Sequence, residues 1–237
     1  MAAVAIAAFK DVCVDATDAP ALSRFWAFAL GADLVESAGN PPRLEHVRPG
    51  DQTIWVNPVP EPRRGKNRVH LDLRLPEADP APLVAAGAVL LREPDDEISW
   101  WLLTDPEGHQ FCAFPPRPGH TPASTQVYEL VVDTADPAAQ AAWWARVTGG
   151  RVESGDGHAA VVDAAGFPWD YWVFGSVPEP KTGKNRVHWD VDMTGTDPGE
   201  LIAAGARVLR EPDDDIHWWI MADPEGNEFC AFAPRGQ

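Results

Sequence analysis

The sequence predicts an α+β fold made of two tandem copies of one domain, with two β-α-β-β-β modules in each copy. The first observation is a repeat. GKNRVHLDLRL at 65–75 recurs as GKNRVHWDVDM at 183–193, and LREPDDEISWWLLTDPEGHQFCAF at 91–114 recurs as LREPDDDIHWWIMADPEGNEFCAF at 209–232. The second is that a single offset of 118 residues relates both pairs (183 − 65 and 209 − 91), so the duplication has no net insertion between them. The third is the order of elements within each copy.

In the first module, the alternating segment VCVDATD predicts a strand, and PALSRFWAFALGA predicts a helix that begins at a proline and ends at Gly31. Three short strands are expected in ADLVES, RLEHVRP and QTIWVNPV, because Gly, Pro and Asn separate them. The second module repeats this order: strand RVHLDLRLP, helix PAPLVAAGA, and strands AVLLR, ISWWLLTD and HQFCAF. The tetrapeptide DPEG at 105 and 223 suits a type I turn, so we assign Asp105 and Asp223 a structural role.

The segment PPRPGHTPASTQ, 115–126, is rich in Pro, Ser and Thr and follows the first copy, as a linker does. We therefore expect one domain at 1–118, a linker at 119–126 and a second domain at 127–237. The sequence leaves open whether modules pair within a copy or across copies. It also leaves open whether the chain is a monomer or a homodimer.

The composition limits the partners. A formal charge of −17 would repel a phosphate backbone and an anionic membrane, so neither is expected to bind. We attribute the acidity to solubility rather than to the steering of a cationic ligand. The N-terminal segment has no basic region typical of a signal peptide, and no apolar run is long enough to span a membrane, so a cytoplasmic location is expected. Three cysteines are too few and too scattered for a disulfide framework.

Paired β-α-β-β-β modules, a strand of the form KNRVH opening the second module, and DPEG(N/H)xFCAF closing it resemble the vicinal oxygen chelate (VOC) superfamily of glyoxalases, bleomycin-resistance proteins and ring-cleaving dioxygenases. The resemblance covers essentially the whole chain, once per half. It implies curved, eight-stranded, half-barrel-like sheets with a ligand in the concavity. In metal-dependent members, His, Gln and Glu side chains from the first and fourth strands of two modules bind a divalent cation there.

The positions that this resemblance implies for the metal ligands are only partly suitable. The first strands offer Asp11, His70, Glu129 and His188, whereas Cys112 and Cys230 stand where the family has glutamate. The remaining strands, TIWVNPV and YWVFGSV, carry no carboxylate. Asp or Glu, His and Cys could together hold zinc, but Cys in the pattern F-C-A-F is typical of a buried apolar residue. We therefore expect no resident cofactor.

Two other groups of residues are candidates for ligand contact. His70 and Asp72, and likewise His188 and Asp190, are two residues apart and so share a strand face, where the Asp could orient the His as a base. The alternative is that they were retained by duplication and only bind backbone groups. Eleven tryptophans are present, and those expected to form aromatic walls for a ligand, rather than core, are Trp55, Trp101, Trp172, Trp189 and Trp219.

Three function classes follow. The first, which the missing carboxylates favour, is a metal-free binding protein that captures an aromatic or basic small molecule, as resistance proteins of secondary metabolism do. The second is a metal-dependent lyase, isomerase or dioxygenase that uses the Asp/Glu, His and Cys positions. The third is a metal-independent enzyme in which His70 or His188 is the acid or base.

Overall fold

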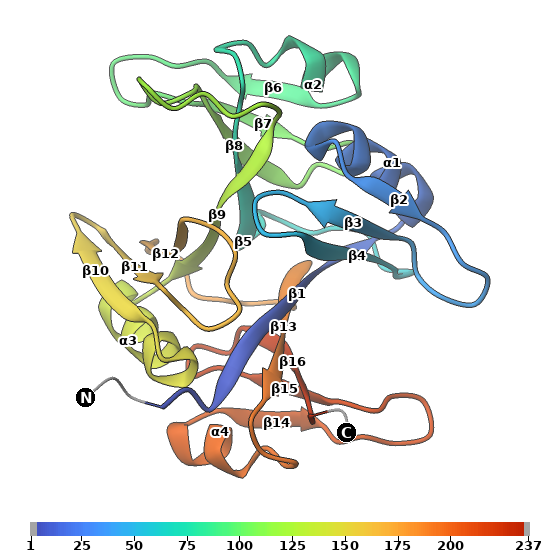
Figure 1. Ribbon diagram of the computed structural model, residues 1–237, viewed down its shortest axis with the longest axis vertical. Helices are drawn as coiled ribbons and strands as arrows, with labels where there is room; N and C mark the ends of the chain where they lie inside the picture. The colour runs from blue at the N-terminus through green and yellow to red at the C-terminus, as the bar shows by residue number, and fades with distance from the viewer. Residues whose placement is uncertain (1–3, 235–237) are drawn as a thin grey trace. The chain divides into compact units, whose positions relative to one another are not determined.

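The computed structural model describes residues 4–234 and contains a strand–helix–three-strand module four times in succession (Figure 1). The predicted α+β fold of four modules is therefore confirmed. The first copy comprises β1 (Ala7–Ala16), α1 (Ala19–Leu30), β2 (Asp33–Val35), β3 (Arg43–Val47), β4 (Gln52–Pro58), β5 (Val69–Arg74), α2 (Ala81–Ala85), β6 (Val89–Arg92), β7 (Trp101–Thr104) and β8 (Gln110–Phe114). The second comprises β9 (Gln126–Thr134), α3 (Pro137–Thr148), β10 (Arg151–Gly155), β11 (His158–Val162), β12 (Tyr171–Ser176), β13 (Val187–Met193), α4 (Gly199–Ala204), β14 (Arg207–Arg210), β15 (Trp219–Ala222) and β16 (Glu228–Phe232).

The strands form two eight-stranded sheets, and each sheet contains strands of both sequence copies. One has the order β14-β15-β16-β13-β1-β4-β3-β2, and the other β10-β11-β12-β9-β5-β8-β7-β6. Modules therefore pair across the copies, which decides between the alternatives that the sequence left open. The chain also divides into two compact units, of which the first comprises the chain up to Val12 and from Val131 onward, and the second comprises Cys13–Leu130. Each unit is described separately below.

The helix α1 has the predicted termini, and α3 of the second copy has equivalent ones. The side chains of Asp18 and Asp136 accept hydrogen bonds from amides in the first turns of α1 and α3, and a proline lies at the start of each helix. Gly31 and Gly149 end the two helices in the left-handed conformation, with φ of 59° and 71°. No helix of residues 4–234 has the length and apolar character that crossing a membrane requires.

The DPEG turns connect parts of each unit that are far apart in the sequence. In the second unit, the Asp105 carboxylate accepts hydrogen bonds from Trp26 Nε1 at 3.1 Å and from the His109 amide at 2.9 Å. The Glu107 carboxylate accepts from the amides of Asp18 at 2.6 Å and Thr17 at 3.0 Å, where α1 begins. The same contacts recur in the first unit, from Trp144 Nε1 to Asp223 and from the Asp136 amide to Glu225. Both aspartates thus have the structural role that the turn predicts.

Two of the tryptophans predicted to face a ligand belong instead to the core of the first unit. Trp172 and Trp189 are both 0% exposed. Their rings lie 4.7 and 5.2 Å from that of Trp144 on α3, and Trp172 also packs on Phe9 at 5.5 Å. The prediction that they form a ligand wall is wrong, because the alternation of a strand does not reveal which face is covered by a helix.

Candidate functional site

Four polar side chains of the second unit form what we call the β5 cluster: His70, Asp72, Cys112 and Glu129. On β5, His70 and Asp72 share a face, and His70 Nδ1 lies 2.7 Å from Asp72 Oδ1. The strand β8 lies beside β5 in the sheet, and the Cys112 amide donates to the same Asp72 oxygen at 2.9 Å. The His–Asp pair that the sequence predicted is therefore hydrogen-bonded, and a backbone amide holds its carboxylate in place.

Glu129 reaches this cluster from β9, the other neighbour of β5 in the sheet. The pKa of Glu129 is raised to about 7, chiefly by burial and then by the nearby Asp72 carboxylate, while Arg74 and His70 act in the opposite direction. Burial and the adjacent Asp72 also raise the pKa of the Cys112 thiol well above its usual value. At neutral pH, Cys112 is thus a neutral thiol, whereas the Glu129 carboxyl is divided between its two protonation states.

Aromatic and cationic side chains adjoin the β5 cluster. The Arg74 guanidinium lies 3.9 Å from the Tyr128 ring centroid and 5.2 Å from that of Phe114, and it donates to the Pro115 carbonyl at 2.9 Å. Trp100 packs on Phe114, and the centroids of their rings are 5.1 Å apart. Sequence reasoning missed Arg74 and Tyr128, although Arg74 is two residues beyond Asp72 on the same face of β5. It also selected Trp101 where its neighbour Trp100 adjoins the group.

The equivalent residues of the first unit form the β13 cluster: Asp11, His188, Asp190 and Cys230. Asp190 on β13 is paired in register with Cys230 on the parallel strand β16. Burial and the Asp190 charge raise the pKa of the Cys230 thiol. This cluster contains an additional cation, because Lys10 Nζ makes an ion pair with Asp11 and lies 3.6 Å from Asp190. Burial lowers the pKa of Lys10, but the hydrogen bond with Asp11 and the charge of Asp190 outweigh it, so the pKa is raised.

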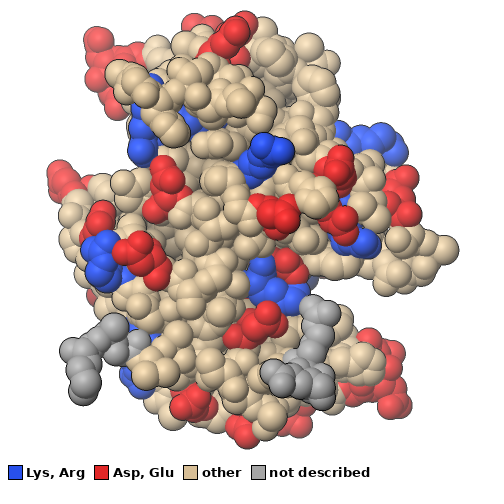
Figure 2. All heavy atoms as spheres, viewed as in Figure 1, with Lys and Arg blue, Asp and Glu red and all other residues tan. Residues whose placement is uncertain are grey.

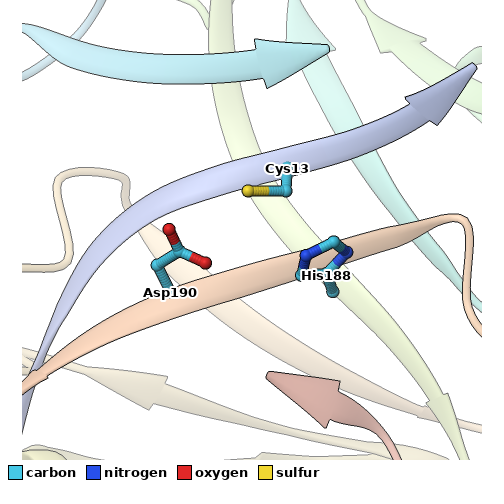
Figure 3. Close-up of side chains that lie close together, drawn as sticks. All are labelled: Cys13, His188 and Asp190. Carbon is cyan, nitrogen blue, oxygen red and sulfur yellow. The ribbon is translucent and has the colours of Figure 1, made fainter. Parts of the chain in front are cut away.

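Figure 3 shows Asp190 and His188 of β13 beside Cys13 of β1. The ligating atoms of these three residues all lie within 4.8 Å of one another, and those of His70, Asp72 and Cys112 meet the same limit. Both sets contain residue types that bind metals, so each has to be compared with the requirements of a metal site.

The remaining predicted aromatic residues lie elsewhere. Trp55, on β4, packs against the Arg43 guanidinium at 5.3 Å, and Trp101 and Trp219 are half-buried on β7 and β15. Trp218, the neighbour of the predicted Trp219, stacks on Phe232 with ring centroids 5.3 Å apart. Trp100 has the equivalent contact with Phe114 in the other unit. Among the predicted ligands, Glu129 lies with His70, and Asp11 with Asp190. The sequence left open which of these first-strand residues lie together, because it left the pairing of the modules open.

The model of one domain family, the glyoxalase-like domain, matches the chain twice, over residues 11–114 and 129–232. The chain belongs to this family. Two solved structures share the fold of this glyoxalase-like protein. Glyoxalase I from Zea mays has a TM-score of 0.66 at 12% identity, with 95% of this chain and 92% of that chain covered. A putative dioxygenase from Bacillus subtilis has a TM-score of 0.62 at 14% identity, with 99% and 87% covered. No curated protein sequence matches the chain significantly.

The donor set of this glyoxalase-like protein does not fit the family's metal site. Cys112 and Cys230 stand where the resemblance implies the glutamate of the fourth strand. The Asp72 oxygen that faces His70 already accepts a hydrogen bond from the Cys112 amide. In the first unit, the Lys10 ammonium is paired with both carboxylates of the β13 cluster. In each unit an imidazole, a carboxylate and a thiol lie close enough together to share a metal ion. Neither group has the His, Gln and Glu combination that the resemblance implies for the family's metal site.

Proposed function

We propose that this glyoxalase-like protein binds a small organic molecule at the β5 cluster and transfers a proton on it without a metal ion. The observation that carries the proposal is the juxtaposition of Glu129, with a pKa raised to about 7, and the hydrogen-bonded pair of His70 and Asp72. A carboxyl group that titrates at the working pH can both accept and donate a proton, which is what general acid–base catalysis requires. Strongly shifted pKa values are also characteristic of functional sites.

The two acid–base groups have different roles. Asp72 Oδ1 is an acceptor, since the Cys112 amide donates to it, so the Nδ1 of His70 is assigned as the donor in their hydrogen bond and Nε2 is the ring nitrogen that can take up a proton. Asp72 therefore acts as the positioning residue for His70. Glu129 approaches from a different strand, so the two groups could act on different atoms of one ligand. This arrangement favours isomerase- or lyase-type proton transfer over redox chemistry.

Capture without turnover is the second candidate, and the aromatic group beside the cluster favours it. Trp100, Phe114 and Tyr128 together offer flat surfaces to an aromatic ligand. The net charge of −17 contributes little specificity, because Figure 2 shows acidic groups dispersed over the visible face and interspersed with Lys and Arg. A cytoplasmic location would suit either candidate.

The experiment that separates these candidates uses solvent deuterium. The protein is incubated with a deproteinised metabolite extract in ²H₂O, and mass spectrometry identifies compounds that gain deuterium or change in mass. Proton transfer at the β5 cluster predicts labelled or converted compounds with the wild-type protein, and a decrease of about 10²- to 10⁴-fold in the rate with Glu129→Gln or His70→Gln.

His188→Gln is the matched control, since it removes the equivalent histidine of the other cluster and is expected to leave the rate unchanged. Equal rates for wild type and Glu129→Gln would reject the acid–base role. If native mass spectrometry detects a bound compound that is neither labelled nor converted, the protein is a capture protein instead.

A further inference from the structure

The duplication supplies an internal comparison between two versions of one site. At the offset of 118 residues, His188, Asp190, Cys230 and Phe232 correspond to His70, Asp72, Cys112 and Phe114, and Asp11 corresponds to Glu129. Two positions differ in charge. Lys10 corresponds to Tyr128, and Asp192 corresponds to Arg74. The clusters therefore share two carboxylates and an aromatic ring, but they differ in the cation beside them.

In the β13 cluster, the cation is the Lys10 side chain. Its Nζ makes an ion pair with Asp11, lies 3.6 Å from Asp190, and is 4.5 Å from the centroid of the Phe232 ring. The charge of Asp192 stabilises the same ammonium. Two carboxylates and a ring face are the groups that recognise a primary ammonium, through ion pairing and a cation–π contact.

In the β5 cluster, the corresponding carboxylates have no such partner. Arg74 is directed to the Pro115 carbonyl and the Tyr128 ring, and no salt bridge of the described residues joins Asp72 or Glu129 to a lysine or an arginine. The Tyr128 hydroxyl accepts a hydrogen bond from Arg117 at 2.5 Å. Burial and the charge of Asp72 raise the pKa of Glu129, although the charges of Arg74, His70 and Arg117 act in the opposite direction.

We propose that the β5 cluster binds the protonated primary amine of a ligand, whose ammonium group lies against Asp72 and Glu129 as the Lys10 ammonium lies against Asp190 and Asp11. The β13 cluster is then occupied by the protein's own lysine, so one chain binds one amine. The rings of Phe114 and Trp100 beside the cluster favour an aromatic group on that amine. This proposal rests on the proposed function, since it names the ligand class of the same site.

The test compares benzylamine, which is protonated at pH 7.5, with benzyl alcohol, which has a similar shape and no charge. Calorimetry is performed at 0.15 M salt to screen the dispersed surface carboxylates. Histidine ring resonances, assigned with His70→Gln and His188→Gln, report which cluster is occupied. We expect one benzylamine per chain, a shift of the His70 resonances only, and affinity for benzyl alcohol lower by at least about tenfold.

Substitutions of Tyr128 and Lys10, which occupy the same position of the repeat, test the comparison further. Tyr128→Lys places a lysine in the β5 cluster and should abolish benzylamine binding, while His188 stays unaffected. Lys10→Ala removes the lysine from the β13 cluster and should allow propylammonium chloride to raise the melting temperature more than potassium chloride does at equal ionic strength. If Lys10→Ala does not fold, the wild type and Tyr128→Lys decide the question.

Equal binding of benzyl alcohol and benzylamine, or undiminished benzylamine binding by Tyr128→Lys, would overturn the amine proposal. Neither result affects the acid–base role, which the deuterium experiment tests through Glu129 and His70. Conversely, benzylamine binding in a protein that labels no compound would support the amine site and reject proton transfer. The two proposals therefore fail by different measurements.

Discussion

Replacing Glu129 by glutamine should make the protein more stable at pH 8. Gln is close in shape to a protonated Glu, so the substitution retains the neutral form and removes the ionised one. The pKa of Glu129 rises from 4.5 to about 7 in the folded protein. Because a tenfold change in an equilibrium constant corresponds to about 1.4 kcal/mol, burying the ionised carboxylate costs up to about 3 kcal/mol at pH values above 7.

The sign of the pH dependence follows from where the proton is bound. Between pH 4.5 and about 7, the unfolded chain has lost this proton while the folded protein still holds it, so stability falls as the pH rises through this window. Below the window both states are protonated, and above it both are ionised, so the contribution is constant on either side. Glu129→Gln should therefore match the wild type at pH 4 and exceed it by about 2–3 kcal/mol at pH 8.

Urea unfolding followed by tryptophan fluorescence measures this difference at pH 4, 6 and 8. Asp223 is also buried, with a pKa raised to about 6, so the wild type has a second source of pH dependence, which cancels when the variant is compared with it. Asp11→Asn is the matched control, and it should destabilise the protein because it removes an ion-pair partner of Lys10. A Glu129→Gln variant with the pH dependence of the wild type would refute the assignment of a buried, mostly neutral Glu129.

Three further outcomes are expected. Benzylamine binding at pH 7, measured by calorimetry in buffers of different ionisation enthalpy, should release about half a proton, because the ammonium ionises the half-protonated Glu129; no release would contradict the contact. Glu107→Gln should lower the free energy of unfolding by about 1–3 kcal/mol in urea titrations, since it weakens the bonds to the start of α1, whereas Glu61→Gln on the exposed loop should have no effect. Elemental analysis of protein purified without chelators should find well under one transition metal per chain, and stoichiometric zinc lost in Cys112→Ser would contradict metal-free function.

The sequence predicts most of this fold because the signals for its elements are local. Strand alternation, a proline and an aspartate at a helix start, and Gly31 at a helix end each act over a few residues. The shared face of His70 and Asp72 could also be predicted, since residues two apart on a strand point the same way. Their hydrogen bond needed only that geometry.

The partner of His70 could not be predicted, because strand pairing between modules is non-local. Asp11 and Glu129 lie at equivalent positions of the two copies, so both pairings satisfy the same local patterns. The contact of Glu107 with the Asp18 amide joins residues 89 apart and has no signal in the sequence near either end. The burial of Trp172 was missed for a similar reason, since only the packing of α3 determines which strand face is covered.

The unequal electrostatics of the two clusters bear on why one of them is more suited to chemistry. In the β13 cluster, the Lys10 ammonium is paired with both carboxylates, so these charges stabilise one another. In the β5 cluster, burial of the Glu129 carboxyl outweighs the charges of Arg74, His70 and Arg117, at a cost of about 3 kcal/mol, which is a large share of the stability of an ordinary domain. Packing does not require that cost, because a glutamine of the same shape would avoid it. A buried group that destabilises the fold and titrates near pH 7 is typical of acid–base sites, where function opposes stability. Lys10 fills the β13 cluster with the protein's own ammonium group, whereas Tyr128 at the equivalent position would leave the β5 cluster open to a ligand.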